Sequence, residues 1–589
     1  MNEFVAPEID WGILSPVLVV LAAGALGVLV EAFVPERARR TTQLVLTLGA
    51  LVGSLVAVAL LWDTVTTDGF AFVVDGTFLL TPFTLGIQAV VALLALLGVL
   101  VVADRTRTGQ DAFAPTAAAV PGTAYEDAAR EAGLQQTEIY PLMLFATGGM
   151  LLFPATDNLI VLFIALEVLS LPLYVLCATA RRRRLLSQEA AFKYFLLGSF
   201  ASALMLFGIA LIYGFSASVS LESVVYVLQH PDSTVLQDMP ALVVAGVLLV
   251  TVGLLFKIGA APLHTWTPDV YQGAPTPITG FMAACVKAAA VGALIRVVFT
   301  LAAGLDEPLR RDLEAGLWAV AILTMLIGTV AGAVQTDVKR MLAYSSIAHA
   351  GFLVVAFVGF SEVGAGASLF YVLAYGLATL GAFAIVTLVR EQDADGVVLG
   401  EATHLSQWAG LGRRSPWLAA AFSLFLLSMA GIPLTAGFIA KFGAFSAAVD
   451  AGAWPLAVLG VLASAVAVFF YVRLIVLMVL TPVAEGAADA DGSAGAGQDV
   501  AATGDGSGSA ASAPTDVPTD VPTDAPAPAG TTTVTQRVLT RASVVVVSSR
   551  GPATVAIVVC AVGVLLLGIV PGPALDWVGQ AAVFRPVAP

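Results

Sequence analysis

Charged residues are scarce in this chain: they make up 12% of its 589 residues, whereas 59% belong to the hydrophobic set. An ordinary soluble protein is roughly 25% charged. Cysteine is also rare, and Cys177, Cys285 and Cys560 stand alone within apolar stretches, without the paired spacing of a zinc or iron–sulfur site. The formal net charge of −14 argues against a polyanion-binding surface. These deficits exclude a soluble globular enzyme, a disulfide framework and nucleic acid as a partner.

Long hydrophobic runs dominate the rest of the sequence. A helix needs roughly 20 apolar residues to cross a hydrocarbon core of about 30 Å, and only helices or closed barrels satisfy their backbone polar groups in lipid. The runs are too long for barrel strands. We therefore predict an all-α polytopic membrane protein with fourteen transmembrane spans, at 12–34, 42–62, 79–103, 139–154, 157–179, 188–214, 240–264, 276–302, 314–334, 341–361, 366–390, 417–449, 455–480 and 553–573.

The positions of the basic residues predict how these spans are oriented. Cytoplasmic loops carry the excess of Lys and Arg, and nearly all basic loop residues follow an odd-numbered span, as in the run Arg181 to Arg184. Arg310 and Arg311 are the exceptions. The tryptophans fall near span ends, where their rings suit the membrane interface. Both termini are therefore expected outside, and the first helix, which no basic segment precedes, is expected to remain in the mature protein.

Two segments fall outside this pattern. Residues 104–138 have mixed charge and are expected to form a cytoplasmic loop. Residues 483–535 have almost no bulky apolar side chains and cannot offset the entropy of ordering. The expected organisation is three N-terminal helices (1–103), the loop (104–138), a first five-helix group (139–302), a second (314–480), a mostly disordered linker (483–550) and a last helix (553–573).

Lysine is rare and unusually placed. Only five of the 27 basic residues are lysines, and four of the five lie inside apolar runs, whereas most arginines lie in loops. A charge within the membrane costs about 2.5 to 3.5 kcal/mol on insertion scales and usually marks an ion or proton path. A lysine in apolar surroundings can release its proton, which arginine cannot. The placement of lysine therefore predicts a path for protons.

Glu167 and Lys257 are the first candidate pair. Lys257 lies in the seventh span shortly before Pro262 and His264, and Pro262 is expected to open the helix and free carbonyl groups for water. Glu167 lies ten residues into the fifth span, without a basic residue nearby in the sequence. If the two side chains meet, each changes the proton affinity of the other. The alternatives are a lysine that reaches the interface and a neutral, hydrogen-bonded glutamate.

The second half of the chain repeats this arrangement. Lys441 follows Pro433 in the twelfth span, so the seventh and twelfth spans each combine a proline break with a buried lysine. Five spans separate them, so they cross the membrane in opposite directions. Spans 4–8 and 9–13 are therefore expected to form two inverted five-helix repeats, with discontinuous helices 7 and 12 that mark a transport site.

Further residues are candidates for carrying protons. Lys287 lies near the middle of the eighth span among small residues. Lys193 lies about six residues into the sixth span, and it either joins the path or reaches the interface. His349 lies early in the tenth span, where it either relays protons near neutral pH or packs as an ordinary core histidine. His264 lies at an interface as a possible relay, and Lys339 is expected in a loop without a function.

Four motifs in the sequence resemble a known family. They are LEVLSLPLYVL at 166–176, KYFLLGSFASALMLFG at 193–208, FKIGAAPLHTWTPDVYQGAPTPITGFMAACVKAA at 256–289 and VKRMLAYSSIAHAGF at 338–352. They are similar to the antiporter-like membrane subunits of the proton-pumping NADH:quinone oxidoreductase, respiratory complex I. The QGAPTP loop and the lysines in the eighth and twelfth spans resemble the subunit N branch of that family. The resemblance covers spans 4–13 and extends more loosely to all fourteen.

The resemblance implies a role for each buried titratable residue. Proton movement would be driven by quinone reduction elsewhere in the complex, through electrostatic coupling along the membrane arm. The implied roles are a first half-channel pair (Glu167 and Lys257), a link between paths (Lys193), a central relay (Lys287), a terminal lysine of a second half-channel (Lys441) and a histidine of the polar axis (His349).

The resemblance also implies that this chain holds no cofactor. NAD, FMN, iron–sulfur clusters and quinone would be bound by other subunits. The expected partners are the other membrane-arm subunits, of types K, M, L, J, A and H, together with the lipid bilayer of a bacterial cell membrane. The 104–138 loop and the 483–535 insertion depart from the compact family pattern, and the resemblance assigns them no contacts.

Other functions share the same expected fold. An Mrp-type cation/proton antiporter subunit would use the same Lys–Glu chemistry, but a sodium site needs several oxygen ligands, and Glu167 is the only carboxylate expected in mid-membrane. A subunit of a hydrogenase-type or ferredoxin-driven complex would differ only in its partners. A purely structural subunit would use the lysines for pairing alone.

Overall fold

The structure is a computed structural model, and it describes residues 9–68, 70–74, 76–105, 111–115, 123–131, 135–230, 239–392, 398–481, 543–546, 549 and 551–583. Within them, twelve helices are long and apolar enough to cross a membrane, and two shorter apolar helices, Ile139–Ala155 and Pro416–Ala430, accompany them. Each of the fourteen predicted ranges contains a helix. The predicted all-α membrane fold is therefore confirmed, whereas the 483–535 segment lies outside the described residues.

Side chains cap the first turns of two N-terminal helices, α1 and α3. Asp10 accepts hydrogen bonds from the backbone N–H groups of Gly12 and Ile13, and Thr81 accepts one from Thr84. Such side chains satisfy amides that have no partner within the helix. These elements are α1 (Trp11–Phe33), α2 (Glu36–Asp68), the antiparallel strands β1 (Ala71–Val73) and β2 (Phe78–Leu80), α3 (Pro82–Val102) and α4 (Ala124–Glu131).

The next group of helices holds the first half of the predicted path. A π turn at Met282–Val286 interrupts its last long helix, directly before Lys287. Such turns are rare and are frequent at functional sites. The elements are α5 (Ile139–Leu152), a 3₁₀ turn (Phe153–Ala155), α6 (Leu159–Cys177), α7 (Arg184–Ser216), α8 (Leu221–Gln229), α9 (Pro240–Ile258), α10 (Trp266–Gly273), α11 (Thr276–Phe281) and α12 (Lys287–Gly304).

The second group, like the first, consists of long helices and one helix that is broken into two. Its elements are α13 (Glu307–Ala333), α14 (Val338–Phe357), α15 (Glu362–Leu388), β3 (Val389–Gln392), β4 (Val398–Glu401), a 3₁₀ turn (Leu405–Trp408), α16 (Leu411–Arg414), α17 (Pro416–Ala430), α18 (Ala436–Asp450) and α19 (Trp454–Leu480). A strand that follows much later, β5 (Ser543–Val546), pairs antiparallel with β3, which gives a sheet of order β4-β3-β5.

The C-terminal elements, α20 (Pro552–Ile569) and α21 (Gly572–Ala581), return to the bundle. α20 packs against α3, α15 and α18. Near its end, Gly568 lies so close to Leu434 and Thr435 that an added Cβ would stand 2.4 Å from the Thr435 carbonyl carbon. In α21, the ring of Trp577 stacks on that of Trp62, with centroids 5.8 Å apart.

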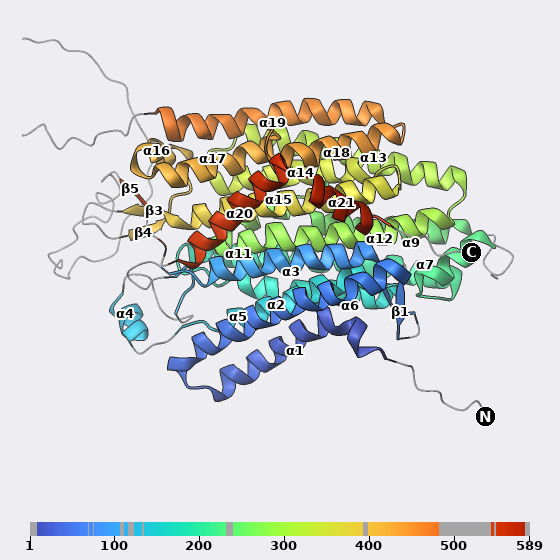
Figure 1. The fold of residues 1–589 in the computed structure, drawn as a ribbon, viewed down its shortest axis with the longest axis horizontal. Coiled ribbons are helices and arrows are strands. Elements are labelled where there is room, and N and C mark those ends of the chain that lie inside the picture. Colours follow the sequence, from blue (N-terminus) through green and yellow to red (C-terminus); the bar gives the residue numbers. More distant parts are fainter. Residues whose placement is uncertain are drawn as a thin grey trace, which may run out of the picture.

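The helices lie side by side along one direction, so the bundle has two ends (Figure 1). The β4-β3-β5 sheet and α4 lie at one end, and β1 lies at the other (Figure 1). α15 and the helical stretch Thr276–Gly304 are buried along their whole apolar windows, whereas only about a third of the corresponding window is buried in α1, α2 and α20. α15 and the stretch Thr276–Gly304 therefore lie at the centre of the bundle.

Candidate functional site

Two helices are broken at the predicted positions. α9 ends at Ile258, where Gly259 has a φ of +77°, and α17 ends at Ala430, where Gly431 has a φ of +82°. Left-handed glycines close helices because they carry no Cβ that would clash. Pro262 and Pro433 follow within three residues and prevent the helices from continuing. The chain resumes as α10 and α18, so discontinuous helices 7 and 12 are confirmed.

Lys257 lies one residue before the end of α9, with its side chain buried. Its amine donates to the hydroxyl of Ser170 on α6 at 2.7 Å and to the hydroxyl of Tyr194 on α7 at 3.3 Å. The amine also lies 5.1 Å from the centre of the Tyr194 ring, within the range of a cation–π contact. Lys257 therefore faces the interior of the bundle and does not reach the interface.

Glu167 lies on α6, one turn before Ser170, and is half-buried. Within the described residues, no ion pair joins its carboxylate to Lys257. The structure therefore places the two predicted partners in the same region without joining them directly.

Lys287 is the first residue of α12, directly after the π turn, and its buried side chain faces α14. Its amine donates to the hydroxyl of Ser346 at 2.6 Å and to the carbonyl oxygen of the same residue. The Ser346 hydroxyl also lies 3.4 Å from that of Tyr271 on α10, and the ring centre of Tyr375 lies 5.0 Å from the amine. The central lysine is therefore linked by hydrogen bonds to the second half of the first broken helix.

His349 lies three residues after Ser346 on α14 and is buried. Its Nδ1 lies 2.7 Å from the Tyr371 hydroxyl, and its Nε2 lies 3.4 Å from the Tyr471 hydroxyl. The Tyr471 hydroxyl in turn bonds to the hydroxyl of Ser345. A row of groups that can each donate and accept a hydrogen bond thus runs beside Lys287.

Lys441 lies on α18 beside the second helix break. Its amine donates to the carbonyl of Ala430, the last residue of α17, at 3.0 Å and to the hydroxyl of Ser464 on α19 at 2.8 Å. Helix termini leave carbonyl groups without intrahelical partners, and the break supplies one of them to the lysine. A small pocket lined by His349, Tyr375 and Ser428 lies against the same break.

Lys193 has different surroundings from these three lysines. It is partly exposed on α7 and forms ion pairs with Glu189 at 2.6 Å and with Asp269 on α10 at 2.7 Å. Asp269 also pairs with Arg340 at the start of α14, at 2.7 Å. Lys193 therefore belongs to a charged cluster at the edge of the bundle, and His264 lies half-buried in the loop between α9 and α10.

Several residues of this site have no counterpart among the sequence predictions. The hydroxyls of Ser170, Tyr194, Ser346 and Tyr471 contact the predicted lysines or histidine, and the Ser345 hydroxyl bonds to that of Tyr471. Ser345 and Ser346 precede His349 by four and three residues, so all three lie on one side of a helix. This spacing is the signal in the sequence that could have identified the two serines.

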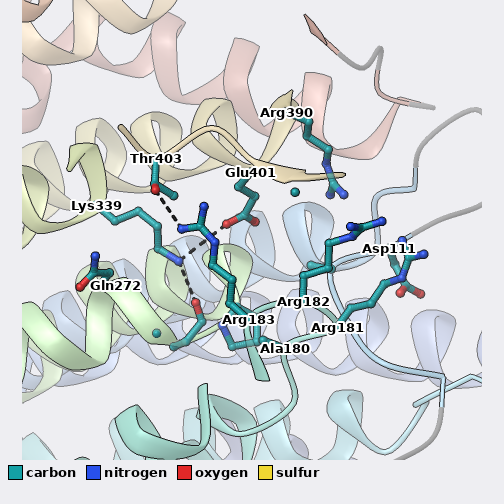
Figure 2. A pocket seen from close by; sticks show the side chains of 15 residues that line it. Asp111, Ala180, Arg181, Arg182, Arg183, Gln272, Lys339, Arg390, Glu401 and Thr403 are labelled. Atoms are coloured by element: carbon teal, nitrogen blue, oxygen red, sulfur yellow. Dashed lines mark hydrogen bonds and ion pairs between the residues drawn. The ribbon is translucent and has the colours of Figure 1, made fainter. Parts of the chain in front are cut away.

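The prediction that Lys339 lies in a loop is wrong. It is the second residue of α14 and is buried. Asp337 caps this helix, which begins at Val338, three residues before the predicted span. The Lys339 amine donates to the carbonyl of Ala274 at 2.8 Å and lies 3.7 Å from Glu401 (Figure 2).

Comparisons with known proteins agree on one family. The family model of NADH:quinone oxidoreductase and Mrp antiporter transmembrane regions matches residues 156–467. A NADH-quinone oxidoreductase subunit N from Beutenbergia cavernae is 58% identical over 469 residues, which cover 78% of this chain and 87% of the relative. Another from Rhodococcus opacus is 51% identical over 494 residues, which cover 80% of this chain and 88% of that one.

Solved structures share the fold. A chain of respiratory complex I from Thermus thermophilus with bound aureothin is 29% identical, with a TM-score of 0.66, over 95% of this chain and 98% of that chain. A chain of the Mrp complex from Dietzia sp. is 20% identical, with a TM-score of 0.69, over 96% of this chain and 97% of that one. At that identity the second likeness concerns the fold alone.

Proposed function

Because this chain belongs to the subunit N family of NADH-quinone oxidoreductases, we propose that it moves protons across the membrane as part of such a complex. One observation supports this most directly. Among the described residues, the amines of Lys257, Lys287 and Lys441 contact hydroxyl and carbonyl oxygens, and none contacts a carboxylate. A lysine without a paired carboxylate can change its charge, which a permanent ion pair would oppose.

The first part of the proposed path runs from Lys257 to Lys287. A proton from the cytoplasm is taken up on Lys257 or Lys287, and the cluster of Lys193 and Asp269 lies on the way to the first. Tyr271 and Ser346 lie between the first broken helix and Lys287. His264 and the carbonyl groups around Pro262 would hold water where side chains do not meet.

The second part runs from Lys287 to Lys441. Ser345 neighbours Ser346, and Tyr471 connects Ser345 to His349 by hydrogen bonds. Hydroxyl groups and a neutral imidazole can pass a proton because each has both a donor and an acceptor. Lys441 receives the proton beside the break that contains Pro433, where Ala430 offers a carbonyl oxygen.

Glu167 acts as the switch in this proposal. When its carboxylate approaches Lys257, it stabilises the charged amine, and when it withdraws, the amine loses that stabilisation and releases its proton toward Lys441. Ser170 keeps the amine in place while the carboxylate is away. The withdrawal is driven electrostatically by quinone reduction in another part of the complex.

The remaining parts of the proposal concern the surroundings of the chain. NAD, FMN, iron–sulfur clusters and quinone bind to other subunits, and this chain carries out no redox step. Its neighbours are membrane-arm subunits of types K, M, L, J, A and H. It lies in a bacterial cell membrane with both termini outside, which puts the end that carries the β4-β3-β5 sheet in the cytoplasm. The ranges 139–302 and 314–480 form the two inverted repeats.

The experiment compares variants of the whole complex reconstituted in vesicles. Lys257→Ala combined with Glu167→Gln should abolish or sharply reduce NADH-driven acidification, while the complex still assembles. Lys257→Arg should have the same effect, because arginine keeps the charge but does not release its proton.

Arg311→Gln, an exposed position on α13, is the matched control and should pump normally. Normal pumping by the double variant would refute the proposed role. Pumping that requires sodium would instead favour an Mrp-type cation/proton antiporter subunit.

A further inference from the structure

A side chain from the second group of helices holds the segment that breaks the first discontinuous helix. After α9 ends, the backbone N–H groups of Gly259 and Ala260 still bond to carbonyl groups of that helix. The next amide, that of Ala261, instead donates to the hydroxyl of Thr324 at 2.9 Å. Thr324 lies in α13, the first helix of the second group. One hydrogen bond thus connects the first break to a helix that begins the other half of the bundle.

Both partners of this bond are buried, since Thr324 is 0% exposed and Ala261 is 1% exposed. Pro262 has no backbone N–H, so Ala261 carries the last amide before the proline. A buried amide that lacks an acceptor loses the hydrogen bonds it would make in water. The Thr324 hydroxyl donates its own hydrogen to the carbonyl of Val320 in α13. Its oxygen is therefore oriented to accept the Ala261 amide.

The second break satisfies a comparable amide in a different way. Gly437, near the start of α18, donates its backbone N–H to the hydroxyl of Ser428 on α17 at 3.1 Å. Those two residues belong to the two halves of one broken helix, whereas Ala261 and Thr324 belong to different groups of helices. The hydrogen bond at the first break is thus a contact between the two groups.

The helix that carries Thr324 also fits tightly against α14. A Cβ on Gly328 would stand 2.4 Å from the backbone nitrogen of Ala348, and a Cβ on Gly351 would stand 2.9 Å from that of Met325. These two contacts lie on either side of His349 in the sequence of α14. Backbones packed this closely leave little room for one helix to move alone. α13 therefore contacts both the first break and the stretch of α14 around His349.

We propose that Thr324 is a positioning residue for Lys257. This role rests on the proposed function, in which Lys257 carries a proton. The lysine lies four residues before Ala261, and its amine bonds to Ser170 and Tyr194 on two other helices. By holding the Ala261 amide, Thr324 fixes the break and with it the end of α9 that carries the lysine. Proton transfer needs its groups within hydrogen-bond reach, so a loosened break slows the transfer.

Variants at Thr324 in the whole complex, reconstituted in vesicles, test this role. Thr324→Val keeps the shape of the side chain but cannot accept the Ala261 amide. The initial rate of NADH-driven acidification per assembled complex should then fall at least about tenfold, because small displacements of reacting groups have large effects on rate. Thr324→Ser keeps the hydroxyl and should pump at close to the wild-type rate. A residue that only filled space would give the opposite order, because valine preserves the packing that serine loses.

Thr329→Val is the matched control on the same helix. Thr329 is also buried, but its hydroxyl donates to the carbonyl groups of Met325 and Leu326 in α13 itself. This variant should therefore pump normally. If Thr324→Val does not assemble, Thr324→Ala replaces it, because the smaller side chain leaves room for a water at the Ala261 amide. The bond to α13 is still lost, so the same slow acidification is expected.

Lys257→Ala, measured in parallel, separates this role from the proposed function. Normal acidification by Lys257→Ala would overturn the proposed function and the role of Thr324 with it. If Lys257→Ala is slow while Thr324→Val or its replacement pumps normally, only the role of Thr324 is overturned. An equal loss in Thr324→Val and Thr324→Ser would overturn it as well, because the hydroxyl would then make no difference.

Discussion

Lys287 and Ser346 are joined twice, since the lysine amine donates both to the hydroxyl and to the carbonyl oxygen of that one serine. The carbonyl holds the amine in place whatever the state of the hydroxyl. The hydroxyl also lies 3.4 Å from Tyr271, so it can turn between two partners. One residue thus fixes the central lysine and connects it to the first broken helix.

Ser346→Ala should separate these two contributions. The carbonyl contact remains, so the protein should fold and assemble, but the hydroxyl that connects Lys287 to Tyr271 is lost. We expect NADH-driven proton pumping in vesicles to fall at least about tenfold, as for other proton-transfer groups. Ser368→Ala is the control, because the buried Ser368 hydroxyl bonds to the carbonyl of Gly364 in its own helix and, among the described residues, to no other group. Equal pumping by the two variants would contradict the relay.

Tyr471→Phe should interrupt the connection between Ser345 and His349. The ring still fills its space, but the hydroxyl that bonds to both residues is absent. We expect slower pumping and a loss of about 1–3 kcal/mol in stability, because the buried Ser345 hydroxyl keeps only its weak contact with the Met429 sulfur. Thermal unfolding in detergent measures the second effect. Tyr213→Phe, at an exposed position, should change neither quantity.

Asp157→Asn should destabilise the chain more than any surface change. Asp157 and Arg296 form a fully buried ion pair of 2.9 Å, and the variant leaves the Arg296 charge without its carboxylate. Breaking such a pair costs about 3–5 kcal/mol. Arg296→Met added to Asp157→Asn should restore most of the stability, because both charges are then absent. Glu307→Gln, which breaks exposed pairs, should leave the unfolding temperature unchanged.

Gly437→Ala should push apart the two halves of the second broken helix. A Cβ on Gly437 would stand 1.7 Å from the carbonyl oxygen of Ser428 on α17, so the backbone has to move. Overpacking of this kind costs about 1–3 kcal/mol, and the displaced α18 would carry Lys441 away from Ala430. Gly443→Ala on the same helix meets its nearest atom at 3.8 Å and should be tolerated. A higher unfolding temperature or normal pumping for Gly437→Ala would disprove the close contact.

The main features of the fold could be predicted from the sequence because lipid leaves few choices. Runs of apolar residues had to be helices, and Pro262 and Pro433 had to end them. Lysines at the centre of such runs, such as Lys287, had to face the interior, because they have no route to water. Both breaks and the burial of Lys257, Lys287 and Lys441 follow from these constraints.

The partners of those lysines could not be predicted, because contacts between helices depend on how the helices are rotated. Glu167 and Ser170 are one turn apart on α6, and the sequence does not distinguish which of them meets Lys257. A serine or tyrosine hydroxyl also gives little signal, since such residues are common in membrane helices. Lys339 was misplaced for a different reason: span ends are uncertain by a few residues, and Asp337 begins the helix earlier than the apolar run does.

The contact between Gly568 and the Leu434–Thr435 backbone means that two stretches far apart in the sequence form the second helix break together. A chain that stopped before Pro552 would keep every lysine, serine and tyrosine of the path, yet one wall of the break at Pro433 would be missing. Loss of pumping after such a truncation would therefore reflect a change in the shape of that break, because every lysine, serine and tyrosine of the path precedes Pro552.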